Sequence, residues 1–277
     1  DMKNRLKHKL LLPNLSFLIL LAVVLSLFLQ SNGTIRHVRE EQARLSQLSE
    51  ETRGMVSAIG AYLDGSLNLD ALEIDHAEVA PHLAEYGLGD LADTVMADLR
   101  KIDELRLRNA DIVSQIDALT ALSSKQSDSY IEQVIARLVD ESTRGDVSAL
   151  ERAVIVGAHM NTTTNQEIRV RFGRVKEDPE VRRSFVGFLD ALIAQVESDI
   201  ERLKGTPFAK LPVKAKEASS KIKELADEYI ADLEQDIQLQ AHIQESADAV
   251  DLGIEQAATL QTNQAFAQIR KAFLLIV

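Results

Sequence analysis

The residues of this 277-residue chain that could bind a small molecule are polar side chains at positions where an amphipathic helix is normally apolar. A polar group that leaves water without a partner costs about 1 to 3 kcal/mol, so such a position needs a hydrogen-bonding partner or a ligand. The spacing of these residues predicts two polar layers between helices. The candidate ligand-binding residues are Arg44, Arg106, Asn109, Arg144, Asn161, Asn165 and Gln240.

One predicted layer contains two asparagines and a glutamine. Asn161 and Asn165 continue an inward-facing helical series that passes through Gly157. Gln240 takes the centre of an apolar stripe on the last helix. If the ascending helix starts near residue 128 at the membrane end, Asn161 and Gln240 both lie about 50 Å from the membrane and share a layer. The alternative is a structural polar layer that sets helix register, as buried amides do in coiled coils.

The other predicted layer contains Arg44, Arg106, Asn109 and Arg144, at about 20 to 25 Å from the membrane. Three guanidinium groups from three helices would suit a small carboxylate, because the arginine fork matches carboxylate oxygens in bidentate geometry. The alternative is that these arginines pair on the surface with acidic neighbours, namely Glu41, Glu104 and Glu141.

Other chemistry finds no support in the sequence. Cysteine is absent, which excludes disulfides, thiolate zinc sites and iron-sulfur clusters. The six histidines lack metal-binding spacing, and His76 and His82 with Glu78 are interpreted as solvated surface. No nucleophile, phosphate-binding or dinucleotide-binding motif occurs, and the net charge of −12 disfavours nucleic-acid binding. We therefore expect no enzyme activity, no cofactor, no metal and no nucleic-acid partner.

The composition predicts an all-α fold to position the candidate residues. Hydrophobic residues reach 45% while aromatic residues are only 4%, a balance typical of long helices and unfavourable for sheets. A loop is expected at 123–127. Helices are expected over 31–63, 76–86, 90–122, 128–142, 147–177, 179–204 and from 213 to the end. We expect an elongated bundle, with a membrane-proximal four-helix section and a second section formed by residues 64–88, 179–204 and the top of the last helix.

The N-terminal segment predicts a membrane anchor. Residues 10–30 contain no charge and are long enough to cross a hydrocarbon layer of about 30 Å. Lysines and arginines precede them, which places residues 1–9 in the cytoplasm and residues 31–271 outside it, in the periplasm or extracellular space. The alternatives are a cleaved signal peptide and a buried helix of a soluble protein. The apolar residues 272–277 are expected to begin a second, truncated crossing, although a short hydrophobic helix end would look the same.

This layout resembles the N-terminal part of a methyl-accepting chemotaxis protein with a helical bimodular sensor region. The resemblance covers the whole chain in architecture, and in sequence it is carried by GAHMNTTTNQEIRVRF within residues 151–172. It implies two stacked four-helix bundles, a homodimer, an organic-acid or amino-acid ligand between helices, and a downstream HAMP domain and signalling coiled coil. It assigns no binding residue to a position in this chain.

The expected function is therefore an extracytoplasmic ligand-sensing region in the inner membrane of a bacterium, in which ligand binding shifts the last helix against the first. The input region of a sensor histidine kinase or of a cyclic-dinucleotide enzyme could have the same layout. The alternative of a different class is a membrane-anchored structural rod without a ligand. The rod predicts layers that are fully apolar or mutually satisfied and no cavity near Arg106 or Asn161, whereas the sensor predicts at least one polar pocket of the size of a water molecule or larger.

Overall fold

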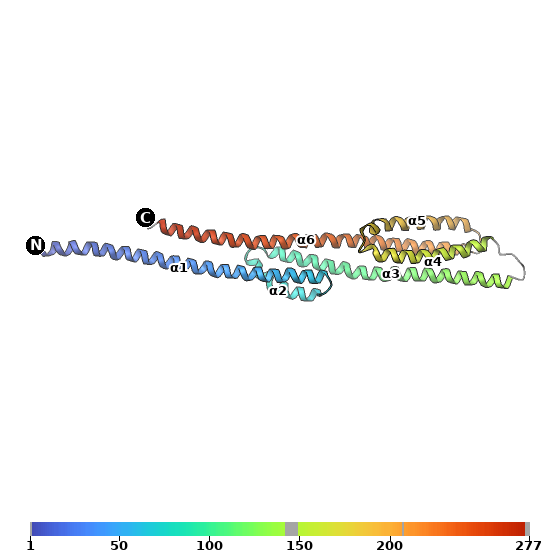
Figure 1. The fold of residues 1–277 in the computed structure, drawn as a ribbon, viewed down its shortest axis with the longest axis horizontal. Coiled ribbons are helices and arrows are strands. Elements are labelled where there is room, and N and C mark those ends of the chain that lie inside the picture. The colour runs from blue at the N-terminus through green and yellow to red at the C-terminus, as the bar shows by residue number, and fades with distance from the viewer. Residues whose placement is uncertain (1, 142–148, 207, 275–277) are drawn as a thin grey trace. The chain divides into compact units, whose positions relative to one another are not determined.

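A computed structural model describes residues 2–141, 149–206 and 208–274, and nearly all of these residues lie in helices joined by short turns (Figure 1). No strand occurs among these residues, so the predicted all-α bundle with an apolar N-terminal helix is confirmed. The helices are α1 (Met2–Leu63), α2 (Leu69–Glu85), α3 (Gly89–Glu141), α4 (Ala149–Val175), α5 (Pro179–Leu203) and α6 (Lys210–Leu274).

The helices form two compact units. Unit 1 comprises Asp1–Arg100 and Ala241–Val277, and unit 2 comprises Lys101–Gln240. Unit 1 therefore contains α1, α2, the start of α3 and the end of α6, whereas unit 2 contains the rest of α3, all of α4 and α5, and the start of α6. The excursion at residues 64–88 was expected to join the 179–204 helix in one section. Instead α2 packs against α1 in unit 1, so that expectation is wrong.

Unit 1 is held together by apolar side chains from all four of its helical segments. Met55 and Ile59 of α1, Leu83 of α2, Val95 of α3 and Val250 of α6 are buried around one small void of about 20 Å³. Burial of apolar surface of this kind is the main favourable contribution to helix packing.

The first and last helices run antiparallel within unit 1. Gln42 Nε2 of α1 donates a hydrogen bond to Thr262 Oγ1 of α6 at 3.4 Å. At about 1.5 Å per residue, twelve residues back along α1 and twelve forward along α6 cover equal lengths. Leu274 therefore lies level with Gln30, where the apolar run of α1 ends.

Unit 2 has a core shared by α3, α4, α5 and α6. Its centre is an aromatic group in which the Phe172 ring lies 5.8 Å from Phe185 and 4.9 Å from Tyr229, between centroids. Ile116 of α3 and Ile222 of α6 are completely buried beside it. Burial raises the pKa of the Tyr229 phenol above its ordinary value, because the apolar core disfavours the phenolate.

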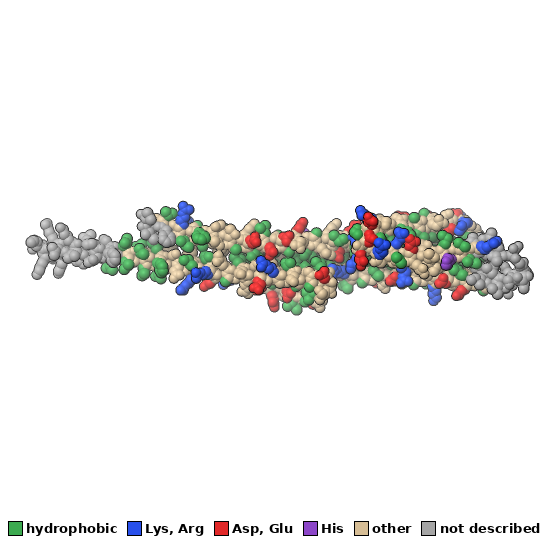
Figure 2. All heavy atoms as spheres, viewed as in Figure 1, with side chains coloured by type: hydrophobic (Ala, Val, Ile, Leu, Met, Phe, Trp, Pro, Cys, Tyr) green, Lys and Arg blue, Asp and Glu red, His purple; other side chains and the backbone are tan. Residues whose placement is uncertain are grey.

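The stretch of α1 that begins at Leu18 is apolar and uncovered. Its described part, from Leu18 onward, includes a stretch that is long and apolar enough to cross a membrane, and none of that stretch is buried. Figure 2 shows these hydrophobic side chains open on the described beginning of the helix. Residues 272–274, where a second crossing was expected to begin, continue α6, and residues 275–277 lie outside the described residues.

Local signals in the sequence explain several helix ends. Asp178 caps α5 by accepting hydrogen bonds from the Glu180 and Val181 backbone N–H groups, with Pro179 at the first position, as predicted. Gly65 adopts φ of +81° after α1, a conformation that favours glycine. The second helix is longer than expected, because Asn68 caps it at Leu69 and Pro81 is accommodated inside it.

Candidate functional site

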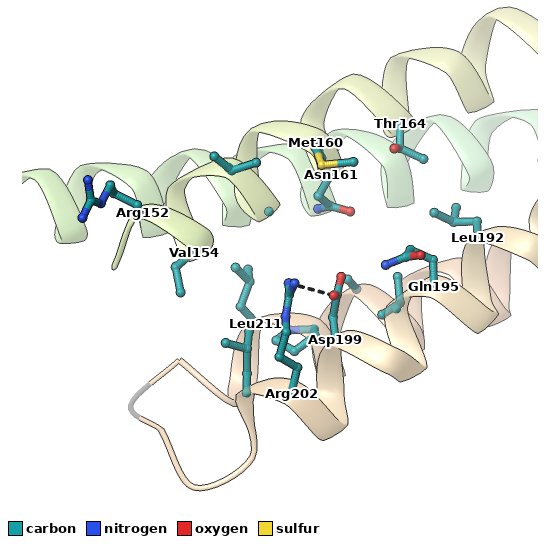
Figure 3. A pocket seen from close by; sticks show the side chains of 16 residues that line it. Arg152, Val154, Met160, Asn161, Thr164, Leu192, Gln195, Asp199, Arg202 and Leu211 are labelled. Carbon is teal, nitrogen blue, oxygen red and sulfur yellow. Dashed lines mark ion pairs between the residues drawn. The ribbon is translucent and has the colours of Figure 1, made fainter. Parts of the chain in front are cut away.

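A cavity of about 510 Å³ lies in unit 2 between α4, α5 and the first turns of α6 (Figure 3). Its polar lining comes from two antiparallel helices: Arg152, Asn161 and Thr164 from α4, and Gln195, Asp199 and Arg202 from α5. Known small-molecule sites have volumes of about 300 to 1,000 Å³ and combine a largely apolar wall with a few converging polar groups. This cavity has that size and that composition.

The apolar wall of the cavity comes from three helices. The apolar lining residues include Val154 and Met160 of α4, Leu192 and Val196 of α5, and Leu211 of α6. Val154, Leu203 and Leu211 also belong to a buried cluster with Phe208, so this end of unit 2 has its own small core. The cavity walls are thus supported by packed side chains.

Gly157 is one reason that the space exists. It belongs to the inward-facing series of α4, and a Cβ atom built at this position would meet nothing within 4 Å. Any larger residue would project into the hollow. A glycine inside a helix costs roughly 0.5 to 1 kcal/mol relative to alanine, so the helix gives up stability where the cavity is open.

Two of the charged groups that line the cavity, Arg202 and Asp199, are paired with each other. Arg202 Nη2 lies 2.9 Å from Asp199 Oδ1, one turn away on α5, as the dashed line in Figure 3 marks. The Arg202 side chain is more exposed than that of Asp199. An exposed pair of this kind contributes little to stability, so a ligand that offers a carboxylate or an ammonium group could replace either partner.

The two predicted asparagines do face the inside of the bundle, and α3 satisfies them. Asn161 Nδ2 donates to Ser127 Oγ at 2.5 Å and to Ser123 Oγ at 3.3 Å. Asn165, whose side chain is buried, donates from Nδ2 to Ser124 Oγ at 3.3 Å. These contacts form a polar layer between α3 and α4, as the register-setting alternative requires, and Asn161 also lines the cavity.

The same contacts explain why residues 123–127 form helix and not the expected loop. Ser127 Oγ donates to the Ser123 carbonyl at 3.1 Å and accepts from Asn161, so its hydroxyl is fully used without leaving the helix. A run of serines favours a loop only when the hydroxyl groups lack such partners. With this segment helical, α3 continues unbroken to Glu141.

Gln240 does not share a layer with Asn161, contrary to the expectation. Gln240 Nε2 donates to Asp236 Oδ1 at 2.9 Å, and Arg106 Nε lies 3.9 Å from Asp236 Oδ2. Arg106 precedes Ser127 by about 21 residues of α3, which is roughly 30 Å of helix. The expectation failed because it placed the start of the ascending helix at residue 128. Ile237, three residues before Gln240 on α6, is exposed.

The predicted arginine layer is not assembled by the described residues. Arg44 belongs to unit 1, is 68% exposed, and pairs with Glu41 of its own helix at 3.6 Å. Arg106 and Asn109 belong to unit 2, and Arg106 has Asp236 as its partner. Surface pairing with carboxylates is favoured in a chain of net charge −12. Arg144 lies outside the described residues.

Asn109 is buried at 8% exposure, and its Oδ1 atom has no hydrogen-bond partner among the described residues. Beside it, Arg108 donates from Nε to Asp232 Oδ2 at 2.6 Å and from Nη2 to Asp232 Oδ1. The hydrogen bonds that Arg108 donates to this carboxylate raise the pKa of Arg108 above its ordinary value. Sequence reasoning missed this pair, because acidic residues on a long amphipathic helix usually face water.

Unit 1 contains a smaller polar hollow of about 230 Å³ between α1 and α2. Arg44 lines it together with Glu51, His82 and Tyr86. The Tyr86 hydroxyl donates to Glu41 Oε2 at 3.1 Å, and burial together with that carboxylate raises the pKa of Tyr86. Of the predicted residues, Arg44 thus lines this hollow, and Asn161 lines the larger cavity.

Two further findings bear on function. Within the described part of the chain, no group of three or more His, Cys, Asp or Glu side chains could hold a metal ion. Compared with known proteins, the chain matches no family profile, no curated sequence and no solved structure.

Proposed function

We propose that this chain is the extracytoplasmic ligand-sensing region of a bacterial transmembrane chemoreceptor, with the unit 2 cavity as its binding site. The observation that carries the proposal is the cavity itself: about 510 Å³ next to Asn161, with polar groups from α4 and α5 converging on it. The resemblance to methyl-accepting chemotaxis proteins supports the type of receptor.

The ligand is a small amphipathic carboxylate, either an amino acid or an organic acid. Arg202 and Arg152 at the cavity can bind a carboxylate, and Asp199 can bind an ammonium group. The Asn161 and Gln195 amides add neutral hydrogen-bonding groups. The apolar wall suits an aliphatic or aromatic body, and its burial contributes affinity in proportion to the apolar area removed from water.

Unit 1 supports the proposed membrane arrangement. Residues 10–30 anchor the chain in the inner membrane with residues 1–9 in the cytoplasm, and residues 31–271 stand outside. The equal level of Gln30 and Leu274 supports a return of α6 to the same membrane face. A ligand that shifts α6, the helix that contributes Leu211 to the cavity, then changes its position against α1, in one subunit of a homodimer.

The ligand-free rod is the competing function, because the Asn161 and Asn165 amides are satisfied by serines, as a structural layer would be. The cavity favours the sensor over the rod, because a structural spacer does not need an open, partly polar hollow beside a satisfied polar layer. A sensor histidine kinase or a cyclic-dinucleotide enzyme could use the same input region.

The test is ligand binding by the full chain in detergent or nanodiscs. A panel of amino acids and mono- and dicarboxylates is screened by thermal shift, and positive compounds are measured by calorimetry. At a ligand concentration of 100 Kd, binding to the folded state adds about 2.7 kcal/mol of stability, so a real ligand raises the melting temperature by several degrees.

Gly157→Leu provides the matched variant, since the new side chain occupies the cavity. Gly173→Leu is its control, because Gly173 is also on α4, also has open space at Cβ, and does not line the cavity. We expect the panel response to survive Gly173→Leu and to disappear in Gly157→Leu. Binding that persists in Gly157→Leu would place the site elsewhere, and no response to any compound would favour the rod.

A further inference from the structure

Leu88 of unit 1 lies between two glycines in the short turn that joins α2 to α3. Gly87 adopts φ of +74°, a conformation that favours glycine, and its N–H donates to the Ala84 carbonyl at 3.1 Å. The Leu88 N–H donates to the Leu83 carbonyl at 2.9 Å, which completes the Schellman arrangement that ends a helix. A Cβ atom on Gly89 would lie 3.0 Å from Ala84 Cβ, so α3 begins in close contact with α2. The backbone of Leu88 is therefore held in one place.

The Leu88 side chain packs onto α6 at Gly253. A Cβ atom built on Gly253 would lie 2.5 Å from Leu88 Cδ2, 3.0 Å from Cδ1 and 3.3 Å from Cγ. Rotation about χ2 exchanges the two methyl groups, so it cannot relieve this contact. Gly253 is the only glycine of α6 and lies in the helix interior, where glycine is less stable than alanine. The close approach of Leu88 accounts for a glycine at this position.

The residues one turn away on α6 make Gly253 the preferred seat for Leu88. Ala249 and Ala257 lie four residues before and after it. If α6 moved by one turn along its axis, about 5.4 Å, one of these alanines would come beneath Leu88 and bring the Cβ that Gly253 lacks. The contact therefore favours a single axial position of α6 against the turn between α2 and α3.

A second contact between α3 and α6 has the same register. Asp98 Oδ2 lies 2.6 Å from His242 Nδ1. Asp98 is ten residues beyond Leu88 on α3, and His242 is eleven residues before Gly253 on α6, so the two antiparallel helices cover nearly equal lengths between the contacts. The His242 side chain is half exposed, and such a pair constrains the helices only weakly. Leu88 is the stronger constraint on the register.

We propose that Leu88, seated on Gly253, is a stop that fixes the axial position of α6 in unit 1. Movement of α6 along its axis then requires Leu88 to leave this seat, because closely packed interfaces change between discrete arrangements. The stop uses no residue of the unit 2 cavity and goes beyond ligand binding. It identifies the contact that a signal carried by axial movement of α6 has to break.

Gly253→Ala tests the contact through the sign of its effect on the melting temperature of the full chain in nanodiscs. In the wild-type background the added Cβ meets Leu88, and we expect a fall of about 1 to 4 °C. In the Leu88→Ala background the same substitution should give a rise of about 1 to 3 °C, because alanine stabilises a helix interior. Gly54→Ala is the matched control and should give a rise in both backgrounds, since Gly54 is exposed within α1 and has open space at Cβ.

Spin labels test whether the contact fixes α6. The chain has no cysteine, so two introduced cysteines are the only labelling sites. Ile74→Cys on α2 and Leu260→Cys on α6 are exposed positions of unit 1, and the distance between their labels reports movement of α6 along α2. We expect one narrow distance distribution in the wild type and a distribution broadened or shifted by up to one turn, about 5 Å, in Leu88→Ala. Leu67→Ala, in the turn between α1 and α2, is the control and should keep the wild-type distribution.

The proposal is supported if removal of Leu88 reverses the sign of the Gly253→Ala effect and also changes the label distance. A Gly253→Ala effect with the same sign in both backgrounds overturns it. An unchanged label distance in Leu88→Ala also overturns it, because the contact would then pack the interface without fixing α6. The Gly157→Leu variant should lose ligand binding and keep the stop, so failure of the cavity proposal is distinguishable from failure of this one.

Discussion

The Arg108 guanidinium of α3 holds both oxygens of the Asp232 carboxylate of α6, and the Asp232 side chain is only 5% exposed. Arg108 itself is 47% exposed and also lies 3.5 Å from Glu228. The pair ties the two longest helices of unit 2 together through a buried negative charge. The two partners therefore contribute unequally to stability. Loss of Arg108 leaves a buried, unpaired carboxylate, whereas loss of Asp232 leaves a guanidinium that is already partly in water.

Replacing Arg108 should consequently cost more stability than replacing Asp232. Arg108→Met leaves a buried, unpaired carboxylate, and we expect the free energy of unfolding to fall by about 2 to 3 kcal/mol in urea denaturation. Asp232→Asn should cost about 1 kcal/mol, because Arg108 can turn toward water and Glu228. Arg169→Met is the control, since its pair with Asp117 is exposed on both sides. Equal losses for Arg108→Met and Arg169→Met would contradict the asymmetry.

The polar layer between α3 and α4 should also depend on its serine. Ser127→Ala removes the closer of the two hydroxyl acceptors of Asn161, and we expect a loss of about 1 to 2 kcal/mol in the same denaturation experiment. Thr163→Ala is the matched control, because its exposed hydroxyl bonds only to the His159 carbonyl of its own helix. A Ser127 variant as stable as the Thr163 variant would mean that the layer does not hold the register.

The Asp178 cap makes the stability of α5 sensitive to acid. The backbone N–H groups of Val181 and Glu180 and the nearby Arg174 lower the pKa of Asp178 below its ordinary value. A carboxyl with a lowered folded-state pKa stabilises the protein above its ordinary pKa, and the contribution is lost as pH falls through the lowered value.

Asp178→Asn keeps a side-chain acceptor but removes the charge. We expect a lower melting temperature than the wild type at neutral pH and a difference that closes as pH falls through the lowered pKa of Asp178. The adjacent Glu177→Gln should follow the wild type across the whole range. A difference between Asp178→Asn and the wild type that stays constant with pH would show that the charge does not matter.

The apolar run of α1 makes a prediction about membrane insertion. An arginine at the centre of a membrane-spanning helix costs about 2.5 to 3.5 kcal/mol for insertion, so Val24→Arg should shift the chain from the carbonate-resistant membrane pellet to the soluble fraction. Gly33→Arg, just beyond the run, should stay in the pellet. The wild-type chain in the membrane should also have its full mass, and a shortened mass would instead indicate a cleaved leader.

The helices themselves could largely be predicted from sequence, because their signals are local. The spacing of apolar residues, the absence of charge before Gln30, and Asp178 followed by Pro179 each act within a few turns of one helix. The inward direction of Asn161 and Asn165 follows from the same periodicity. The prediction of a loop at 123–127 was wrong. The serine hydroxyl groups there accept hydrogen bonds from asparagines of α4, about 35 residues further along the chain.

The cavity and the pairs between helices could not be predicted from the sequence, because they depend on the tertiary structure. Gly157 lay in the predicted inward series, yet the cavity beside it needs Gln195 and Arg202 from α5 and Leu211 from α6, and no local pattern aligns those helices. The same holds for His242 and Asp98, which are far apart in sequence and meet only through the antiparallel register of α3 and α6.

The sequence by itself determined that this chain is helical, acidic and equipped with an apolar anchor-like segment, since composition and periodicity act residue by residue. Only the tertiary structure decided which polar side chains meet. Helix register is set by the sum of many apolar contacts along each interface, and a shift of one turn would exchange every partner.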